Sequence, residues 1–378
     1  MTAWPTDLYQ LSSPDRTHDG DAPLAPSLPS TDDKLRFLRS RAAHGCEPEE
    51  TEWLETHMSW VLLAGERALK MKKPVRFPFL DFSTVELRER HCREELRLNR
   101  RLAPDVYRRL VAMQWADGAL HLVAEERLPA PGVTVDWLVE MQRLPRDEML
   151  DWRIAERRVD PDDIDRLAQT LAAFYRDAPR TRLDASAWFE RLRSEHAATE
   201  RVLLLPGFAS LGAGPVLDRL SKALDEHAAA LHERVRGGHV VEGHGDLRPE
   251  HICLLDFPVV IDCLEFDAGL RQVDPFDELS FLGLECAMAG AEWIGPRIIA
   301  SVGARLGECA PPALVCLYTA NRAALRARLA AAHLLDDESR TPQRWLPLGQ
   351  RYLQRAAEAL DKLSEPPLGA GTTQDHGV

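Results

Sequence analysis

Two histidines and an aspartate lie close together in one glycine-containing loop, as His244, Asp246 and His251. The loop leads into a short apolar run, and loops of this kind place polar side chains at the edge of a cleft. After a turn, a second apolar run at residues 259–261 ends on Asp262. We therefore expect the carboxylates of Asp246 and Asp262 to converge on the same cleft.

A converging pair of carboxylates with a neighbouring nitrogen or oxygen ligand suits a hard divalent cation. Mg²⁺ commonly takes only one or two protein carboxylates together with phosphate oxygens. The simpler alternative is that His244 and Asp246 are turn residues whose side chains cap the backbone. The second carboxylate, Asp262, favours the chemical interpretation.

The order of these motifs resembles the aminoglycoside phosphotransferase family, which has the protein-kinase-like fold. The family pattern is HGDxxxxN, then a strand ending in Ile-Asp, then a helix start of the type DPxxDLA. Segments further upstream resemble an uncharacterised bacterial branch of the same family. The matching segments are residues 55–61, 70–74, 79–83, 244–251, 261–262 and 273–279, within a resemblance that covers roughly residues 51–329.

The resemblance implies a kinase-type transfer, in which the protein positions the γ-phosphoryl group and a base orients the acceptor hydroxyl. By position in the motif, Asp246 is that base and Asp262 is the main Mg²⁺ ligand. The second metal ligand of the family follows five residues after the catalytic aspartate, where Asn is usual and this chain has His251. A neutral imidazole suits Mn²⁺ or Zn²⁺ better than Mg²⁺. We therefore expect the second metal site to be weakened, altered in preference or absent, and His244 to hold the loop through hydrogen bonds.

A kinase of this type also needs a lysine that reaches the α- and β-phosphates from a strand of the N-terminal half. Lys70 and Lys72 lie two residues apart and therefore on one face of that strand. The order Ala-Leu-Lys-Met resembles the family's strand and favours Lys70, with Lys72 as the alternative. The lysine is expected to pair with a glutamate of the following helix. Glu95 has the family's spacing and Glu94 is the alternative, although a solvated helix face explains either glutamate equally well.

The sequence contains neither a GxGxxG loop nor a GxxxxGK[ST] phosphate loop. In a kinase, the turn with Thr56, His57 and Ser59 is therefore expected to supply the donors to the phosphates. Residues 135–141 fit the hinge at which adenine bonds to backbone groups, with Met141 as an apolar wall. The alternative for Met141 is an ordinary core position.

The second half offers further polar residues around the expected helix 276–289. Asp274 and Asp277 precede or open this helix, and the first explanation of both is N-capping. By resemblance, Asp277 also braces the catalytic loop. Glu265 and Asp267, just beyond the metal ligand, are candidates to face a cationic acceptor.

One later helix carries three polar residues spaced four apart, Tyr318, Arg322 and Arg326. Residues with this spacing share one face of a helix. We expect a solvated face, and the alternative is a contact to the acceptor or to phosphate.

The pattern of apolar residues changes along the chain. Up to residue 143 it favours strands, interrupted by one helix at 84–102 that Ser83 and Glu86 mark as its start. The expected strands are residues 57–63, 68–72, 110–115, 120–124 and 135–141. From Asp147 the period becomes 3.6, which indicates helices at 161–176, 215–235, 312–333 and 345–363.

We therefore predict an α+β, protein-kinase-like two-lobe fold, with a small antiparallel β-sheet N-lobe carrying one helix and a larger, mostly helical C-lobe. Residues 32–145 form the N-terminal lobe and residues 146–362 the helical C-terminal lobe with the catalytic loop and acceptor site. Residues 1–31 and 363–378 are rich in Pro, Ser, Gly and polar residues and are expected to be disordered tails.

The composition excludes several classes of protein. The 378 residues include 47 Lys and Arg against 60 Asp and Glu, a formal net charge of −13, which argues against a nucleic-acid-coating protein. No apolar run of about 18 residues and no secretory signal are present, so we expect no membrane span and a cytoplasmic location. The seven cysteines form no CxxC pair and are expected to be reduced thiols.

Together these observations predict an ATP-dependent phosphotransferase, a kinase that uses ATP with Mg²⁺ or Mn²⁺ and transfers the γ-phosphoryl group to a hydroxyl of a small molecule. Neither the acceptor nor the oligomeric state follows from the sequence. One alternative is a catalytically silent nucleotide-binding module, which His251 motivates. Another is a metal-dependent hydrolase built on His244, Asp246, His251 and Asp262, although it leaves Lys70 and the N-terminal sheet without a task.

Overall fold

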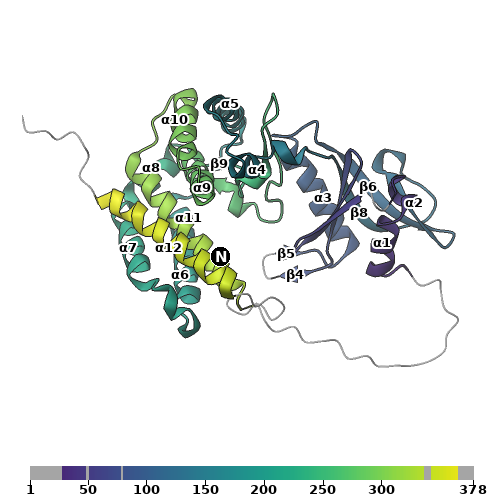
Figure 1. Ribbon diagram of the computed structural model, residues 1–378, viewed down its shortest axis with the longest axis horizontal. Coiled ribbons are helices and arrows are strands. Elements are labelled where there is room, and N and C mark those ends of the chain that lie inside the picture. The colour runs from purple at the N-terminus through teal and green to yellow at the C-terminus, as the bar shows by residue number, and fades with distance from the viewer. Residues whose placement is uncertain (1–27, 48–50, 78–79, 336–341, 365–378) are drawn as a thin grey trace, which may run out of the picture.

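The computed structural model describes residues 28–47, 51–77, 80–335 and 342–364 (Figure 1). Most of the two expected tails, residues 1–27 and 365–378, lies outside this part of the chain. The N-terminal lobe begins earlier than predicted, because Ser30 caps helix α1 (Thr31–Leu38) through a capping box with Asp33. At the other end, helix α12 continues to Ser364.

The N-terminal lobe contains a six-stranded antiparallel sheet in the order β1-β2-β3-β8-β6-β7. A short hairpin of β4 (Arg76–Phe77) and β5 (Leu80–Asp81) stands beside it. The strands of the sheet are β1 (Thr51–Glu55), β2 (Ser59–Ala64), β3 (Arg67–Lys72), β6 (Tyr107–Ala116), β7 (Ala119–Ala124) and β8 (Val133–Gln142). The predicted strands are thus confirmed, whereas β1 was not predicted.

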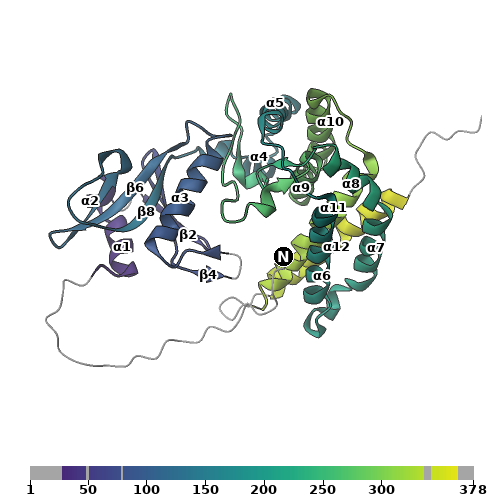
Figure 2. The same ribbon diagram turned by 180° about the vertical axis from the view of Figure 1, so that it is seen from behind.

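Helices cover both faces of this sheet (Figures 1 and 2). On one face, α1 and α2 (Arg41–His44) pack on Leu69 and Met71 of β3. On the other face lies α3 (Val85–Asn99), whose Cys92 packs with Ala68 of β3. The predicted helix is confirmed, but its start is not: Thr84 rather than Ser83 is the N-cap, and its side chain accepts a hydrogen bond from the Leu87 N–H at 3.2 Å.

The C-terminal lobe is mostly helical, as predicted. The expected helix 215–235 is broken at His227 into two helices. Three further helices of this lobe, α4, α6 and α10, were not predicted. The helices are α4 (Leu150–Ala155), α5 (Pro161–Asp177), α6 (Ala185–Leu203), α7 (Gly214–Glu226), α8 (Ala228–Arg236), α9 (Pro275–Met288), α10 (Ile294–Leu306), α11 (Pro312–Ala332) and α12 (Pro342–Ser364).

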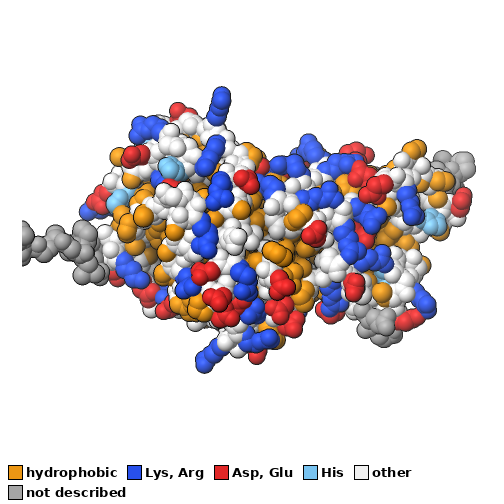
Figure 3. Space-filling view, turned by 90° about the horizontal axis from the view of Figure 1, so that it is seen from above, with side chains coloured by type: hydrophobic (Ala, Val, Ile, Leu, Met, Phe, Trp, Pro, Cys, Tyr) orange, Lys and Arg blue, Asp and Glu red, His pale blue; other side chains and the backbone are white. Residues whose placement is uncertain are grey.

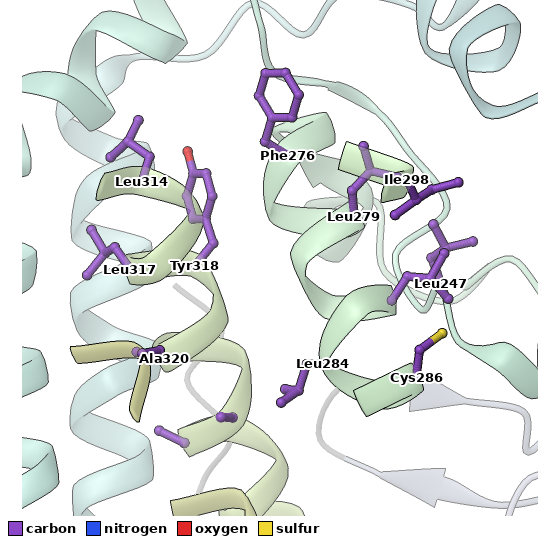
Figure 4. Close-up of a cluster of buried hydrophobic side chains, with 14 of the residues drawn as sticks. Leu247, Phe276, Leu279, Leu284, Cys286, Ile298, Leu314, Leu317, Tyr318 and Ala320 are labelled. Carbon is purple, nitrogen blue, oxygen red and sulfur yellow. The ribbon is translucent and has the colours of Figure 1, made fainter. Parts of the chain in front are cut away.

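Two small antiparallel strand pairs hold the loop around Asp246, residues 243–251, against these helices. They are β9 (Val241–Glu242) with β12 (Gln272–Val273), and β10 (Ile252–Cys253) with β11 (Val259–Val260). The second pair is the predicted hairpin. Within the loop, Leu247 is fully buried among side chains of the C-terminal core, near Leu279 of α9 and Ile298 of α10 (Figure 4). Burial of this leucine between two polar residues anchors the loop to the core.

The surface carries both signs of charge. On the face shown in Figure 3, Lys and Arg side chains alternate with Asp and Glu side chains over both lobes. All seven cysteines are free thiols, as predicted, and Cys92, Cys253, Cys263 and Cys286 are buried.

Candidate active site

The two lysines of β3 face helix α3, because strand residues alternate between the two faces of the sheet. Their common partner is Glu95, which is fully buried. Glu95 Oε1 lies 2.8 Å from the Lys70 Nζ, and Oε2 lies 2.6 Å from the Lys72 Nζ. The structure therefore brings Glu95 to the lysines. The alternative, Glu94, instead contacts Arg97 at 2.7 Å at the surface.

The second contacts of the two lysines differ. The Lys70 Nζ also lies 2.6 Å from Asp262 Oδ1 and lines a cavity between the lobes. The Lys72 Nζ instead contacts Glu265 and stands over the ring of Phe82. The side chain of Lys72 is 1% exposed and that of Lys70 is 14% exposed. Lys70 can therefore reach a ligand in the cavity, whereas Lys72 is sealed inside the protein.

Charge in this group of side chains does not balance. Two lysines, Lys70 and Lys72, face three carboxylates, those of Glu95, Asp262 and Glu265. Burial alone lowers the pKa of Lys70, but the carboxylates of Asp262 and Glu95 outweigh it and hold this pKa well above its usual range. Both lysines are therefore charged, and one negative charge is left over for a cation to compensate.

The loop around Asp246 is held by hydrogen bonds to its backbone. His244 is fully buried; its Nε2 donates to the Ile261 carbonyl at 2.9 Å, and its Nδ1 accepts the Asp246 N–H at 3.3 Å. Burial lowers the pKa of His244, which keeps the imidazole neutral and suited to this pair of bonds. Since both ring nitrogens are engaged by the backbone, His244 is not available as a metal ligand. This argues against the hydrolase alternative.

Glu278 of α9 braces the same loop. Its carboxylate accepts the N–H groups of His244 at 3.0 Å and Gly245 at 2.6 Å, and the Tyr175 hydroxyl donates to it at 2.8 Å. Gly245 has φ +89°, and a Cβ there would lie 3.1 Å from the Leu264 Cβ. The glycine therefore allows both the left-handed turn and the close approach.

The expectation that Asp277 braces the loop is wrong. Its carboxylate binds Arg322 of α11, with the Arg322 Nε and Nη2 at 2.8 and 2.6 Å. The N-cap of α9 is Asp274, which accepts the Phe276 N–H at 2.9 Å. Successive helix residues point about 100° apart. The neighbouring acids Asp277 and Glu278 therefore serve different partners.

His251 lies beside Asp262. The Asp246 carbonyl can only accept, so the His251 Nδ1 donates to it at 2.9 Å, and Nε2 is the ring nitrogen left to face the cavity. This Nε2 lies 3.5 Å from Asp262 Oδ2 and 3.3 Å from the Arg248 Nη2. Asp262 adopts φ +61°, and its N–H donates to the Tyr107 hydroxyl at 3.1 Å. The local backbone thus turns the carboxylate of Asp262 towards both Lys70 and His251.

Arg248 contacts the carboxylate expected to act as base. Its Nη2 lies 3.0 Å from Asp246 Oδ2, and its Nη1 lies 2.6 Å from Glu250 Oε1. No sequence pattern predicted a role for this arginine. Its position two residues after Asp246 was the only signal for it.

The cavity between the lobes has a volume of about 470 Å³, within the range of small-molecule sites. Lys70 lines this cavity, whereas Glu95 and Lys72 lie behind Lys70 and do not line it. The turn of residues 56–59, at one side of the cavity, is ordered by Thr56, whose Oγ1 accepts the Ser59 N–H at 2.9 Å. The candidate site residues among its lining are Ser59, Lys70, Met141, Asp246, His251 and Asp262.

Two further expectations are wrong. Tyr318, Arg322 and Arg326 do not form a solvated face: the Tyr318 hydroxyl donates to Asp274 at 3.0 Å, and the Arg326 Nε donates to Glu285 at 2.9 Å. Glu265 is not free to face a cationic acceptor, because it pairs with Lys72.

Within the described ranges, no group of three or more His, Cys, Asp or Glu side chains could hold a metal ion by itself. Asp262 and His251 offer one carboxylate and one imidazole nitrogen. Two protein ligands fit a cation that also takes phosphate oxygens, and the imidazole favours Mn²⁺ relative to Mg²⁺.

No helix in the described part of the chain combines the length and the apolar character needed to cross a bilayer.

Comparisons with known proteins give the following relatives. No family model matches the sequence. Uncharacterised proteins of Mycobacterium bovis and Mycobacterium tuberculosis are each 30% identical over 341 residues, which is 86% of this chain. The chain spans 64% of the length of these relatives.

Solved structures of small-molecule kinases are similar over most of the chain. The choline kinase LicA of Streptococcus pneumoniae has 13% identity and a TM-score of 0.48, covering 88% of this chain and 99% of the kinase. An aminoglycoside phosphotransferase of Alicyclobacillus acidocaldarius has 14% identity and a TM-score of 0.46, covering 91% and 96%. A choline/ethanolamine kinase family protein of Mesorhizobium loti has 16% identity and a TM-score of 0.45, covering 89% and 95%. The chain has an antiparallel N-terminal sheet followed by a mostly helical part, and it is similar in structure to these choline/ethanolamine kinase family proteins and this aminoglycoside phosphotransferase.

Proposed function

We propose that this chain is an ATP-dependent phosphotransferase that transfers the γ-phosphoryl group of ATP to a hydroxyl of a small molecule. One observation carries the proposal: Lys70 bridges the buried Glu95 and Asp262 at the wall of a cavity that also contains Asp246. A lysine held by a glutamate and facing a metal-binding carboxylate is what phosphate binding in a kinase requires.

On the nucleotide side, the residues divide the work by their position in the cavity. Lys70 binds the phosphates, because its ammonium group is charged and partly exposed. The turn that ends at Ser59 supplies backbone donors, and Met141 lies beside the adenine. When bound at Asp262 and His251, a Mg²⁺ or Mn²⁺ ion supplies charge neutralisation of the phosphates.

On the acceptor side, Asp246 accepts the proton of the attacking hydroxyl. The Arg248 guanidinium holds its carboxylate at 3.0 Å, and the hydrogen bonds of His244 and Glu278 hold the loop. The pair of Lys70 with Asp262 is expected to open when nucleotide enters, since the phosphates then compete for the lysine.

Nucleotide binding and transfer test the proposal separately. Titration calorimetry with Mg-ATP and Mn-ATP is expected to show binding that the substitution Asp262→Asn weakens by about tenfold or more. The control is Asp256→Asn, an exposed aspartate in the turn between β10 and β11. Absence of binding, or binding that Asp262→Asn leaves unchanged, would refute the proposal.

Incubation with γ-labelled ATP and a pool of small metabolites then measures transfer. A labelled product supports the kinase. Nucleotide binding without a labelled product and without phosphate release identifies a catalytically silent nucleotide-binding module instead. The presence of His251, where the resembled family usually has Asn, motivates this alternative.

A further inference from the structure

Two side chains of the N-terminal lobe bind the backbone at Asp262. The Tyr107 hydroxyl accepts the Asp262 N–H at 3.1 Å, and the Asn99 Oδ1 accepts the N–H of the next residue, Cys263, at 2.8 Å. Tyr107 and Asn99 are each 1% exposed. Two consecutive N–H groups of the C-terminal lobe are therefore held by buried side chains of the other lobe.

The side-chain amide of Asn99 is itself fixed in orientation. Its Nδ2 donates to the Glu95 carbonyl at 2.9 Å, which leaves Oδ1 as the atom that faces Cys263. Asn99 follows Glu95 by four residues, so both side chains lie on one face of α3. The carboxylate of Glu95 binds Lys70 at 2.8 Å. One face of α3 therefore positions both Lys70 and the backbone beside Asp262.

Tyr107 is held by the packing of its ring. It is the first residue of β6 and belongs to the buried apolar cluster between the sheet and α3, together with Ala68 and Cys92. Tyr107 also lines the cavity that Lys70 and Asp262 line. Because the ring is fixed by its apolar neighbours, the hydroxyl has a fixed place from which to bind the backbone.

The backbone at Asp262 has a conformation that its surroundings must impose. Its φ of +61° lies in the left-handed region, which residues other than glycine seldom adopt, and such residues persist where neighbouring contacts hold them. In the C-terminal lobe, the Ile261 carbonyl accepts the His244 Nε2 at 2.9 Å, and the Leu264 N–H donates to the His244 carbonyl at 3.1 Å. The two bonds from the N-terminal lobe fall between these, at the left-handed residue and its successor.

Contacts of the Asp262 side chain can exchange, whereas its backbone contacts are built to stay. The carboxylate is 44% exposed and meets Lys70 at 2.6 Å, a pair that the phosphates of a nucleotide can separate. The bonds to Tyr107 and Asn99 are buried and involve no charged group. Hydrogen bonds around a metal ligand orient it, and losing one typically weakens metal binding by about 10–100-fold.

We propose that Tyr107 and Asn99 are positioning residues, which hold the Asp262 carboxylate where it can bind the divalent cation of the nucleotide; this inference rests on the proposed function. When Lys70 turns from Asp262 to the phosphates, the two backbone bonds keep the carboxylate in place. Tyr107 and Asn99 thereby act on the cation through Asp262 and not by touching it.

Nucleotide affinity with and without metal tests this proposal. Titration calorimetry with a non-hydrolysable ATP analogue is run once with Mn²⁺ and once in EDTA, and the ratio of the two affinities measures the contribution of the cation. Tyr107→Phe keeps the ring and removes the hydroxyl. We expect it to lower this ratio by about tenfold. The affinity in EDTA should stay that of the wild type, since Lys70 keeps Glu95.

Asn99→Ala removes the second backbone bond and provides an independent variant. It should lower the same ratio by about tenfold as well, with the affinity in EDTA again unchanged. A loss of general stability would not produce this pattern, because a disturbed cleft weakens the binding of the analogue in both conditions. Circular dichroism establishes that each variant is folded.

The matched control is Tyr352→Phe, which removes another buried tyrosine hydroxyl, bound to Glu285 at 2.9 Å in the helical lobe. It should leave both affinities unchanged. A folded Tyr107→Phe or Asn99→Ala protein that keeps the wild-type ratio shows that the residue concerned does not position Asp262 for the cation. A wild-type ratio near one overturns the inference for both residues. Absence of analogue binding in either condition overturns the proposed function itself.

Discussion

The two sides of the cleft use charged residues in different ways. On the nucleotide side, two lysines share three carboxylates, and the Lys70 to Asp262 contact is partly open, with Asp262 44% exposed. On the side of Asp246, the cations are arginines: Arg322 binds Asp277 and Arg326 binds Glu285, while Arg248 is shared by Asp246 and Glu250. The lysine group thus has a partly exposed contact, whereas the pairs of Arg322 and Arg326 lie within the helical lobe.

The type of basic side chain, lysine or arginine, matches this difference. A lysine ammonium is a compact charge on a flexible stem, so it can leave Asp262 for a phosphate without rebuilding its surroundings. A guanidinium is a rigid fork, and Arg322 binds Asp277 through two of its nitrogens. The pair of Lys70 with Asp262 is therefore suited to exchange ligands, while the pair of Arg322 with Asp277 is suited to stay in place.

The largest expected effect comes from replacing Asp246, the proposed base, while the nucleotide-binding residues stay unchanged. Asp246→Asn should lower the rate of phosphoryl transfer by about 10²–10⁴-fold, because proton transfer from the acceptor loses its carboxylate. Nucleotide affinity should stay close to that of the wild type, since Lys70 and Asp262 are untouched. Steady-state kinetics and titration calorimetry measure the two quantities. Transfer within tenfold of the wild type, or of the Asp256→Asn control, would remove Asp246 from the mechanism.

The second largest expected effect distinguishes the structural role of Lys72 from the phosphate-binding role proposed for Lys70. Lys72→Met should lower the free energy of unfolding by about 3–5 kcal/mol, because Glu265 is left buried without its partner. Lys70→Met should destabilise less, since Glu95 keeps Lys72, but it should weaken nucleotide binding more. Urea unfolding and calorimetry check both variants. The reverse order of effects would make Lys72 the phosphate ligand.

The nucleotide side should also respond to pH through helix α3. Burial, with Lys72 and Arg90 nearby, lowers the pKa of His91 to about 4, whereas an unfolded histidine has a pKa of about 6.5. Between these values the unfolded chain binds more protons, so the free energy of unfolding falls as the pH falls from about 6.5 to 4. The slope from this residue should stay below ~1.4 kcal/mol per pH unit, because its ring is partly exposed.

Urea titrations at pH 7, 5.5 and 4.5 measure this dependence. His91→Gln should flatten it in that window. His121→Gln, at an exposed position on β7, should not. Equal slopes in all three proteins would show that His91 titrates alike in the folded and unfolded states.

The smallest effect concerns the cation. His251→Asn is expected to shift the ratio of Mg²⁺- to Mn²⁺-supported activity towards Mg²⁺ by about tenfold or less, because an amide oxygen replaces an imidazole nitrogen. An amide N–H can keep the bond to the Asp246 carbonyl that the His251 Nδ1 makes at 2.9 Å. Kinetics with each cation measure the ratio. An unchanged ratio would show that the His251 Nε2 does not touch the metal.

Sequence patterns predicted the N-terminal sheet better than the C-terminal helices. Alternation along β3 places Leu69 and Met71 on one face and both lysines on the other, and the structure has this arrangement. Helix α6 was missed because its buried face includes His196 and Thr199 beside Trp188, which obscures the apolar period.

The error at α11 has a different cause. Arginines spaced four apart give the same pattern whether they meet water or acids of a neighbouring helix. Only the packing of α11 against α9 brings Asp277 and Glu285 to Arg322 and Arg326. Long-range partners of this kind leave no local signal.

Local order along the chain was enough to determine the two-lobe fold, the lysine face of β3, the loop around Asp246 and the place of His251 in it. Which lysine opens into the cavity, which acid braces the loop and which acids meet the arginines of α11 were decided by folding. The physical reason is distance along the chain: Lys70 and Asp262 are 192 positions apart, and their contact exists only once the lobes have packed together.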